Sequence, residues 1–281
     1  MSRREVITAT IEPQWVPVRS LVVTIDGTTG IRTGLAMISA RASKPDCTEV
    51  EYKRADGEVV KTAWSDLDVE AVIKGRPWRT FPWYLGQLNH SGLYWCDTER
   101  AMVGYESRLE LSRLMMADFD TAVKNVVSQP FRIWGWIGGE RILRVPDYLV
   151  ISDGGPVVID VTRAEKLKDP KFTAMFDRTR RVVEARGWRY EIANEPPRVE
   201  FLNVRFLAGY RRKWLFDDEI LDDVRHSAHS VPELSIGDIT SHTVCSQPIA
   251  LAGLLHLLWR QELTFDLKQR LSPTTMVRFA A

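Results

Sequence analysis

Two apolar runs separated by a tight turn signal constrain the fold of this chain most strongly. Residues 145–150 read Val-Pro-Asp-Tyr-Leu-Val and residues 157–162 read Val-Val-Ile-Asp-Val-Thr, with Asp-Gly-Gly at residues 153–155 between them. β-Branched and aromatic runs on either side of an Asp-Gly pair are typical of an antiparallel hairpin. The sequence therefore predicts two paired strands here, each carrying one acidic residue.

The register of that hairpin brings the two acids together. A two-residue turn at Asp153-Gly154 places Asp147 directly opposite Asp160, whereas a turn one residue later pairs Asp147 with Thr162. Both registers leave the two acids on one face of the sheet, because side chains alternate along a strand. Facing carboxylates repel each other, and a divalent cation would remove that repulsion. Mg²⁺ is typically held by one or two carboxylates together with a substrate phosphate.

A third acid is expected from the helix that precedes the hairpin. The apolar spacing of residues 105–118 predicts a helix, on which Glu106 and Glu110 lie one turn apart. A pair of glutamates at this spacing is also common on a solvated helix face. It gains meaning from its order in the chain, because an acidic helix precedes a Pro-Asp strand and a second acidic strand.

The remaining elements of this region predict an α/β core. Strands are expected at residues 131–137, 142–152 and 157–162. Asp169 and Pro170 are suited to begin a helix and Gly187 to end it, and a last strand follows at residues 188–193. A helix between two strands of one sheet favours a parallel crossover. We therefore predict a mixed sheet flanked by helices.

Two further regions flank this core. Before it, hairpins are expected at residues 21–40 and 49–64, followed by a short helix with Ser65 as N-cap. After it, the pattern predicts a strand at residues 203–210 and then three helices followed by two short strands. The helices are expected at 217–229, 235–242 and 248–259, and the strands at 263–267 and 275–279. Three helices followed by two strands are the pattern of a winged helix.

The composition is that of a globular protein and gives no sign of a membrane segment. The 281 residues carry 38 basic and 37 acidic side chains, a formal charge of +1. The most apolar later run, residues 248–259, is too short to span a bilayer, and the start lacks the apolar core of a secretory signal. Three scattered cysteines suit a reducing compartment. We expect a cytoplasmic protein without a membrane partner, and the near-neutral charge by itself argues against a free-standing nucleic-acid binder.

An ordered set of motifs resembles the TnsA-like endonuclease subunits of heteromeric transposases, which belong to the PD-(D/E)xK, restriction-endonuclease-like superfamily. The match covers residues 105–162 and extends to about 193, and residues 254–277 resemble the C-terminal winged-helix region of such subunits. The first hundred residues match no well-known member. The motifs are Tyr105-Glu106-Ser107-Arg108-Leu109-Glu110, Asp118-Phe119-Asp120, Gln129-Pro130-Phe131, Val145-Pro146-Asp147-Tyr148 and Ile159-Asp160-Val161.

The resemblance implies a fold and a function. It implies a restriction-endonuclease-like nuclease domain at residues 96–197 and a winged-helix-like partner-binding region at 198–281, while the hairpin signals alone predict a β-rich domain at 1–95. The expected activity is Mg²⁺-dependent cleavage of double-stranded DNA at transposon ends, with Mn²⁺ able to substitute. The expected protein partners are a DDE-type transposase subunit and an AAA+ ATPase regulator.

The resemblance also assigns roles to single residues. It implies that Glu110, Asp147 and Asp160 hold the metal, and that the catalytic set also includes Glu106, Gln129 and Thr162. Thr162 departs from the family, which has a lysine two residues after the strand acid to position or polarise the attacking water. Two alternatives therefore stay open, namely a catalytically degenerate DNA-binding and assembly module and a restriction-type nuclease of the same superfamily.

Basic residues cluster around the second helix of the core. Residues 163–189 hold nine basic and four acidic side chains, a local excess of +5, and residues 210–213 add a second cluster before five acids at 217–223. A solvated helix face is an equally good interpretation of this excess. The candidate contacts to phosphate, which position DNA without reading its sequence, are Arg163, Lys166, Arg178, Arg181, Arg211 and Arg212.

Overall fold

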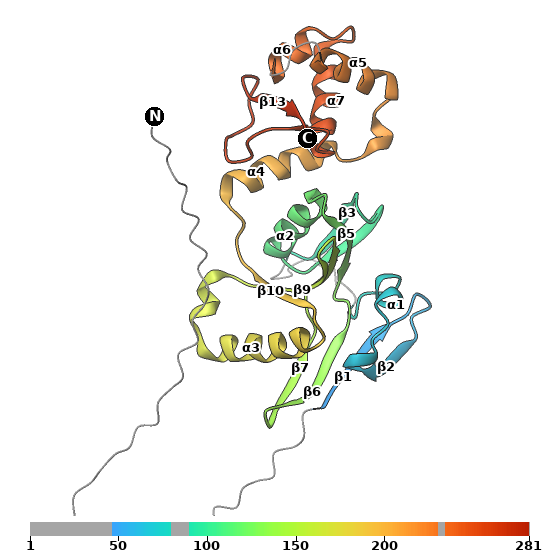
Figure 1. The fold of residues 1–281 in the computed structure, drawn as a ribbon, viewed down its shortest axis with the longest axis vertical. Helices are drawn as coiled ribbons and strands as arrows, with labels where there is room; N and C mark the ends of the chain where they lie inside the picture. Colours follow the sequence, from blue (N-terminus) through green and yellow to red (C-terminus); the bar gives the residue numbers. More distant parts are fainter. Residues whose placement is uncertain (1–46, 80–89, 230–233, 281) are drawn as a thin grey trace, which may run out of the picture. The chain divides into compact units, whose positions relative to one another are not determined.

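The computed structural model describes residues 47–79, 90–229 and 234–280. All of them belong to one compact unit, Ala42–Ala281. This part of the chain is mixed α/β, with several sheets flanked by helices (Figure 1). The expected α/β class is therefore confirmed, while the hairpin predicted at residues 21–40 lies outside the described residues.

The hairpin that carries the two acids forms as predicted. Strand β8 (Tyr148–Ser152) pairs antiparallel with β9 (Gly155–Val161). Ser152 pairs with Gly155, so Asp153 and Gly154 form the two-residue turn. Tyr148 pairs with Ile159, and the same register carries Asp147 opposite Asp160.

The crossover after the hairpin is also confirmed. Helix α3 (Pro170–Ala185) begins at Asp169, whose side chain accepts a hydrogen bond from the amide of Lys171 (2.9 Å). The helix leads into β10 (Arg189–Ala193), which pairs in parallel with β9. Proline at the first helical position and an acidic N-cap explain why the sequence alone located this helix.

Three expectations about the core need correction. Helix α2 (Arg108–Phe119) begins after Ser107, so Glu106 precedes the helix instead of lying on it. The strand expected at residues 142–152 is two strands, β7 (Glu140–Arg144) and β8, in different sheets. Strand β5 (Val123–Ser128), which pairs antiparallel with β8, was not predicted.

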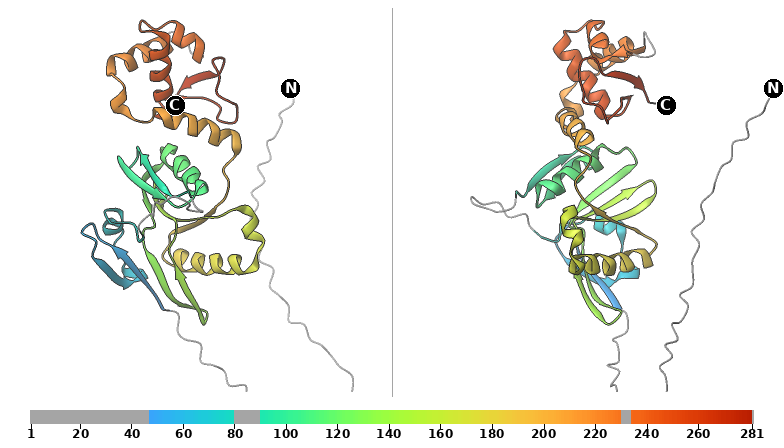
Figure 2. Two further views of the ribbon diagram at one scale, coloured as in Figure 1. Left: turned by 180° about the vertical axis from the view of Figure 1, so that it is seen from behind. Right: turned by 90° about the vertical axis from the view of Figure 1, so that its left-hand side faces the viewer.

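The four-stranded sheet that contains the β8–β9 hairpin has the order β10-β9-β8-β5, and a helix packs on each of its faces. Leu114 of α2 packs with Val150 and Val157 on one face. Phe176 of α3 packs with Leu149 and Val158 on the other. Alternate residues of each strand thus point to different helices, and both views in Figure 2 let the two helices be followed.

A second sheet crosses the boundary expected at residue 95. Its order is β2-β1-β6-β7, so β1 (Cys47–Lys53) and β2 (Val59–Ala63) share one sheet with β6 (Arg132–Ile137) and β7. The hairpin expected at 49–64 is confirmed. Strand β1 is thus hydrogen-bonded to the later strand β6, and β2 joins the sheet through β1. A separate antiparallel pair consists of β3 (Gly92–Cys96) and β4 (Ala101–Tyr105).

The short helix after β2 begins later than expected. Helix α1 (Val69–Ile73) has Asp68 as its N-cap, and the Asp68 side chain accepts from the amide of Ala71 (3.2 Å). Ser65 lies in a preceding 3₁₀ turn, Trp64–Asp66. Trp64 of this turn is buried in the core, and the helix begins only after Asp68.

Gly135 of β6 gives a test of the second sheet. Its φ is +149°, and a methyl group on it would lie 1.9 Å from the carbonyl oxygen of Cys47. We expect Gly135→Ala to lower the free energy of unfolding by at least about 2 kcal/mol, measured by urea denaturation. Gly209→Ala is the control, because a methyl group there meets none of the described residues within 4 Å. Equal stability of the two variants would contradict this pairing.

The C-terminal part is helical, and one expected strand is wrong. Residues 203–210 belong mostly to helix α4 (Arg198–Leu207), where Asn203, Val204 and Leu207 are buried at helical spacing. The three later helices and the final antiparallel strands are confirmed. They are α5 (Asp218–His229), α6 (Ile236–Ser241), α7 (Gln247–Trp259), β12 (Leu263–Thr264) and β13 (Met276–Phe279), with β11 (Leu234–Ser235) as a third strand beside β13.

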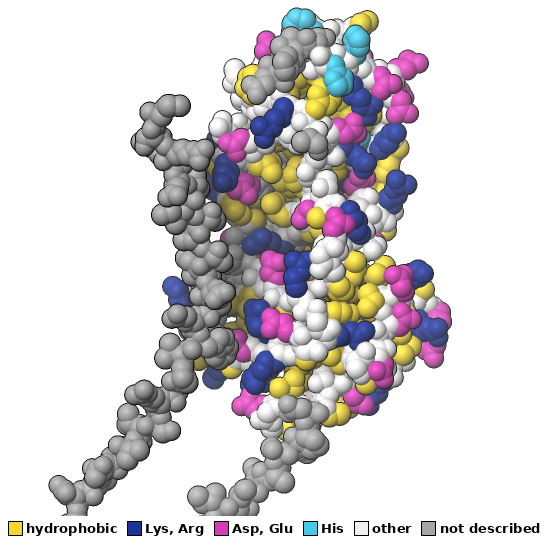
Figure 3. All heavy atoms as spheres, in the orientation of Figure 1, with side chains coloured by type: hydrophobic (Ala, Val, Ile, Leu, Met, Phe, Trp, Pro, Cys, Tyr) yellow, Lys and Arg dark blue, Asp and Glu magenta, His cyan; other side chains and the backbone are white. Residues whose placement is uncertain are grey.

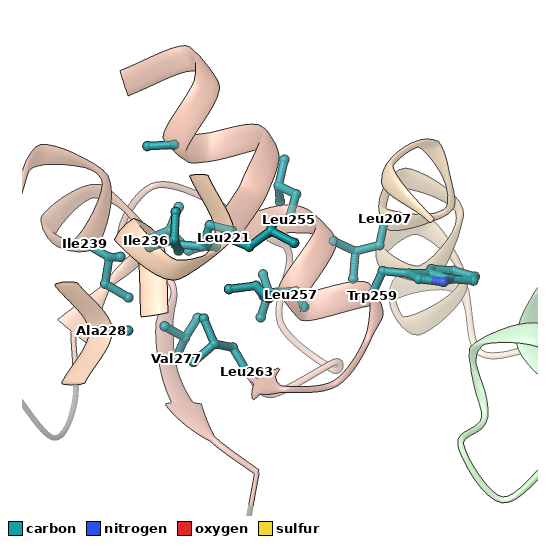
Figure 4. Packing of buried hydrophobic residues seen from close by; sticks show 14 of the residues in the cluster. Leu207, Leu221, Ala228, Ile236, Ile239, Leu255, Leu257, Trp259, Leu263 and Val277 are labelled. Carbon is teal, nitrogen blue, oxygen red and sulfur yellow. The ribbon is translucent and has the colours of Figure 1, made fainter. Parts of the chain in front are cut away.

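Helix α7 forms the centre of this C-terminal core. Leu255 and Leu257 are at most 1% exposed and pack with Leu221, Ile239 and Val277 (Figure 4). A helix that is apolar around its circumference must be enclosed by its neighbours. No helix in the described ranges is long and apolar enough to cross a membrane.

Candidate active site

Asp147 is held at the entrance to β8 by three hydrogen bonds. Its amide donates to the carbonyl of Ile159 (3.1 Å), and its own carbonyl accepts from the amide of Gln129 (2.8 Å). Its carboxylate oxygen Oδ2 accepts from the amide of Val161 (2.6 Å). Gln129 and Ile159 therefore fix the backbone of Asp147, and the amide at the end of β9 holds its carboxylate, which remains partly exposed.

Asp160 lies opposite Asp147 in the hairpin, but the surroundings of its side chain differ. Its side chain is 0% exposed, and it is bound by Arg144 at the end of β7. The Arg144 Nε lies 3.1 Å from Oδ1 and 3.2 Å from Oδ2, and Nη2 lies 2.6 Å from Oδ1. The hydroxyl of Tyr190 donates to Oδ2. The structure thus places Asp160 in a buried ion pair.

Glu110 lies in the first turn of α2, whose N-cap is Ser107. Its Oε2 accepts from the amide of Glu106 (2.7 Å) and its Oε1 from the hydroxyl of Ser107 (2.9 Å). The Ser107 hydroxyl in turn accepts from the amide of Glu110 (3.1 Å). The Glu106 carboxylate points elsewhere, to Arg79 at 3.4 Å. Glu106 therefore supports Glu110 through its backbone.

The three carboxylates interact electrostatically. Burial, with the charges of Asp160 and Glu110, raises the pKa of Asp147 from 3.8 to about 7, against the Val161 amide and Arg144, which lower it. Burial also raises the pKa of Glu110, although the Glu106 amide and the Ser107 hydroxyl oppose this. A hydrogen-bonded, half-buried carboxyl with such a pKa marks a functional-site candidate. Together, Asp147, Glu110 and Asp160 carry more negative charge than Arg144 neutralises.

This pKa predicts a pH-dependent stability. Between the ordinary pKa of 3.8 and the folded value of about 7, the folded protein binds a proton at Asp147 that the unfolded chain has released. The contribution of this group is therefore present at acid pH and is lost as pH rises through about 7. In EDTA, we expect wild type to lose up to about 3 kcal/mol between about pH 5 and pH 8 relative to Asp147→Asn, measured by urea unfolding. Parallel pH profiles would contradict the raised pKa.

Gln129 and Thr162 lie next to the acids. Gln129 is 2% exposed with a φ of +44°, and its Oε1 accepts from the backbone amide (3.1 Å) and Nε (3.4 Å) of Arg79. Thr162 follows Asp160 on the same face; it is buried, and its amide donates to the carbonyl of Ala193 (2.9 Å). Neither residue brings a positive charge to the site.

A magnesium ion fits two of the expected ligands. In the described ranges, no three His, Cys, Asp or Glu side chains come together as a metal-binding group. One or two carboxylates are, however, the usual protein share for Mg²⁺, and the charge of Glu110 is among the causes that raise the pKa of Asp147. The shared excess of negative charge is the feature that fits a cation. Asp160 does not fit, because Arg144 and Tyr190 engage both of its oxygens.

Some of the basic residues expected to contact DNA are exposed, and others are engaged by neighbouring residues of the chain. Arg163 and Lys166 are exposed directly after β9, and Arg181 is exposed on α3. Arg178 is paired with Glu140. Figure 3 shows basic and acidic side chains interleaved on the face it presents, without a large basic patch.

The second basic cluster has structural contacts instead of free cations. The Nε of Arg211 donates to the carbonyl of Trp95 (2.7 Å), and the guanidinium lies 4.5 Å from the ring centre of Tyr94. Arg212 is half-buried beside Trp214, 5.8 Å from its ring centre. We therefore exclude Arg211 from the set of candidate phosphate contacts, whereas Arg212 stays in it, because its buried Nε has no hydrogen-bond partner among the described residues.

Sequence reasoning missed Arg144, Tyr190 and Arg79. A buried aspartate requires a charged or polar partner, so the sequence could predict that some basic or polar residue lies near Asp160, but not which one. Its identity depends on β7 belonging to the second sheet, which no local pattern shows. Arg79 likewise reaches Gln129 and Glu106 from a distant part of the chain.

A scan of protein-family models gives no match for this chain, and neither does a search of curated proteins. The case for a function therefore rests on the geometry and the charges of the site.

Proposed function

We propose that this chain is a metal-dependent DNA endonuclease subunit with a restriction-endonuclease-like core, acting at transposon ends within a heteromeric transposase. The observation that carries the proposal is the pair Asp147 and Glu110 beside the buried Arg144–Asp160 ion pair, where burial and the charges of Asp160 and Glu110 raise the pKa of Asp147 to about 7. The sheet order β10-β9-β8-β5, with α2 before it and α3 as crossover, supports the same fold assignment.

In this proposal the residues of the chain bind and orient. Asp147 and Glu110 hold Mg²⁺, or Mn²⁺ in its place. When bound, the ion supplies charge neutralisation at the scissile phosphate and a more acidic water. The backbone hydrogen bonds of Asp147 fix its carboxylate, and the helix cap fixes that of Glu110. Arg163, Lys166 and Arg181 bind flanking phosphates without reading bases.

The C-terminal region suits a protein partner better than a DNA groove. Helix α7 is buried along most of its length, so it cannot enter the major groove as a recognition helix. Its exposed first turns carry apolar side chains instead, with Ile249 46% and Leu251 39% exposed. We propose that this winged-helix-like region binds the DDE-type transposase or the AAA+ ATPase regulator.

Two observations favour a second candidate, a nuclease-fold module that binds DNA and assembles partners without cutting. Arg144 neutralises Asp160, and Thr162 offers no charge where a lysine is expected. Both features reduce the resemblance to a working nuclease centre.

Cleavage of end-labelled transposon-end DNA by the chain together with its transposase tests the two candidates. The proposal expects nicks that require Mg²⁺ or Mn²⁺, disappear in EDTA and become rarer at high salt. Partner-dependent DNA retention without any metal-dependent nick would reject the endonuclease and support the assembly module. Neither cleavage nor retention would reject both.

A further inference from the structure

Asp147, Glu110 and Asp160 accept different numbers of hydrogen bonds from the described residues. A carboxylate offers about four lone-pair positions. Asp160 receives three contacts from Arg144 and one from Tyr190. Glu110 receives two hydrogen bonds, and Asp147 receives one. Lone pairs remain at Asp147 and Glu110, whereas those of Asp160 are in use.

Arg144 also brings the fixed positive charge that the strand sequence lacks. Position 162, on the same face as Asp160, is an uncharged threonine. Arg144 comes from the other sheet, is only 23% exposed at its side chain, and lowers the pKa of Asp147 by its charge. A guanidinium is permanently charged and grips a carboxylate with two parallel donors, so it stays at Asp160.

From these contacts we propose that Arg144 is a positioning residue that withholds Asp160 from the metal, so that the site binds a single divalent cation on Asp147 and Glu110. The inference rests on the proposed function, because it concerns the ion of that same site. It excludes a pair of metals bridged by the two strand acids.

Titration of Mn²⁺ into the full-length chain, followed by calorimetry, tests the stoichiometry directly. Wild type is expected to bind one Mn²⁺ per chain. The double variant Arg144→Gln with Asp160→Asn removes both charges together, and its Mn²⁺ affinity is expected to stay within about threefold of wild type. Asp147→Asn is expected to weaken binding by at least about tenfold.

The single substitution Arg144→Gln is expected to raise the affinity for Mn²⁺ instead of lowering it. Arg144→Gln frees the Asp160 carboxylate, so Mn²⁺ binding is expected to tighten by at least about tenfold or a second ion to bind. This variant leaves a buried charge unpaired and its folding must be checked by circular dichroism. If it does not fold, the double variant carries the test, because it leaves no unpaired charge.

The outcomes separate this inference from the function it rests on. Two ions on wild type, or a loss of affinity in the double variant as large as that of Asp147→Asn, would overturn the inference and leave a metal-dependent nuclease standing. A wild-type chain that binds no Mn²⁺ would overturn both. One ion on wild type with retained affinity in the double variant supports the inference.

Discussion

Asp147→Asn is expected to lower metal-dependent DNA cleavage by at least about a hundredfold. The substitution keeps the size of the side chain and its acceptor for the Val161 amide (2.6 Å). It removes the negative charge that a cation needs. Because burial and two neighbouring acids raise the pKa of Asp147 to about 7, the variant is also expected to be at least as stable as wild type. Lost activity with gained stability would separate a functional role from a structural one.

Asp153→Asn is the matched control for that variant. Asp153 lies in the turn of the same hairpin, and its carboxylate is exposed and contacts Lys124 at 3.2 Å. Exposed pairs of this kind contribute little to stability. Cleavage by Asp153→Asn should remain near the wild-type rate. Undiminished cleavage by Asp147→Asn would refute the assignment of the site.

Trp64→Ala is expected to cause the largest loss of stability, about 3–5 kcal/mol. The indole Nε1 of Trp64 donates to the carbonyl of Val182 in α3 (2.9 Å). Its ring packs edge-on against Phe131 at 5.3 Å and Trp188 at 5.2 Å between ring centres. Removing it opens a cavity where the two sheets and α3 meet. Chemical denaturation followed by tryptophan fluorescence and by circular dichroism measures the effect.

Val59→Ala serves as the comparison, because Val59 is 51% exposed on β2. We expect it to change the free energy of unfolding by no more than about 0.5 kcal/mol. If Trp64→Ala were as mild as this, the strands at residues 47–63 would form a region independent of α3. The two sheets would then not share one core.

Local signals explain what could be predicted. An Asp-Gly turn limits the β8–β9 hairpin to two registers, so Asp147 and Asp160 could be placed on one face from the sequence alone, and the structure selects the register that sets them opposite each other. The proline at the start of α3 and the glycine after it are equally local. Such features need no knowledge of the rest of the fold.

The errors arose where distant contacts decide the structure. Pro146 interrupts the run at residues 142–152, and whether β7 continues beside β8 or joins β6 depends on the second sheet. Residues 203–210 are apolar enough for either a strand or a helix, and packing against the C-terminal core selects the helix. The partner of Asp160 was missed for the same reason. Arg144 lies only sixteen positions away in the chain, yet it approaches from the other sheet.

The tight turn between β8 and β9 also has a consequence for the order of folding. A hairpin closed by two residues forms in microseconds, whereas the parallel pairing of β9 with β10 must wait for the α3 crossover and carries a larger loop-closure cost. The two strand acids therefore meet early, before the longer-range contacts between the sheets deliver the guanidinium that neutralises one of them. We expect Asp147→Asn to refold faster than wild type in stopped-flow fluorescence, since the substitution removes the repulsion within the first structure to form.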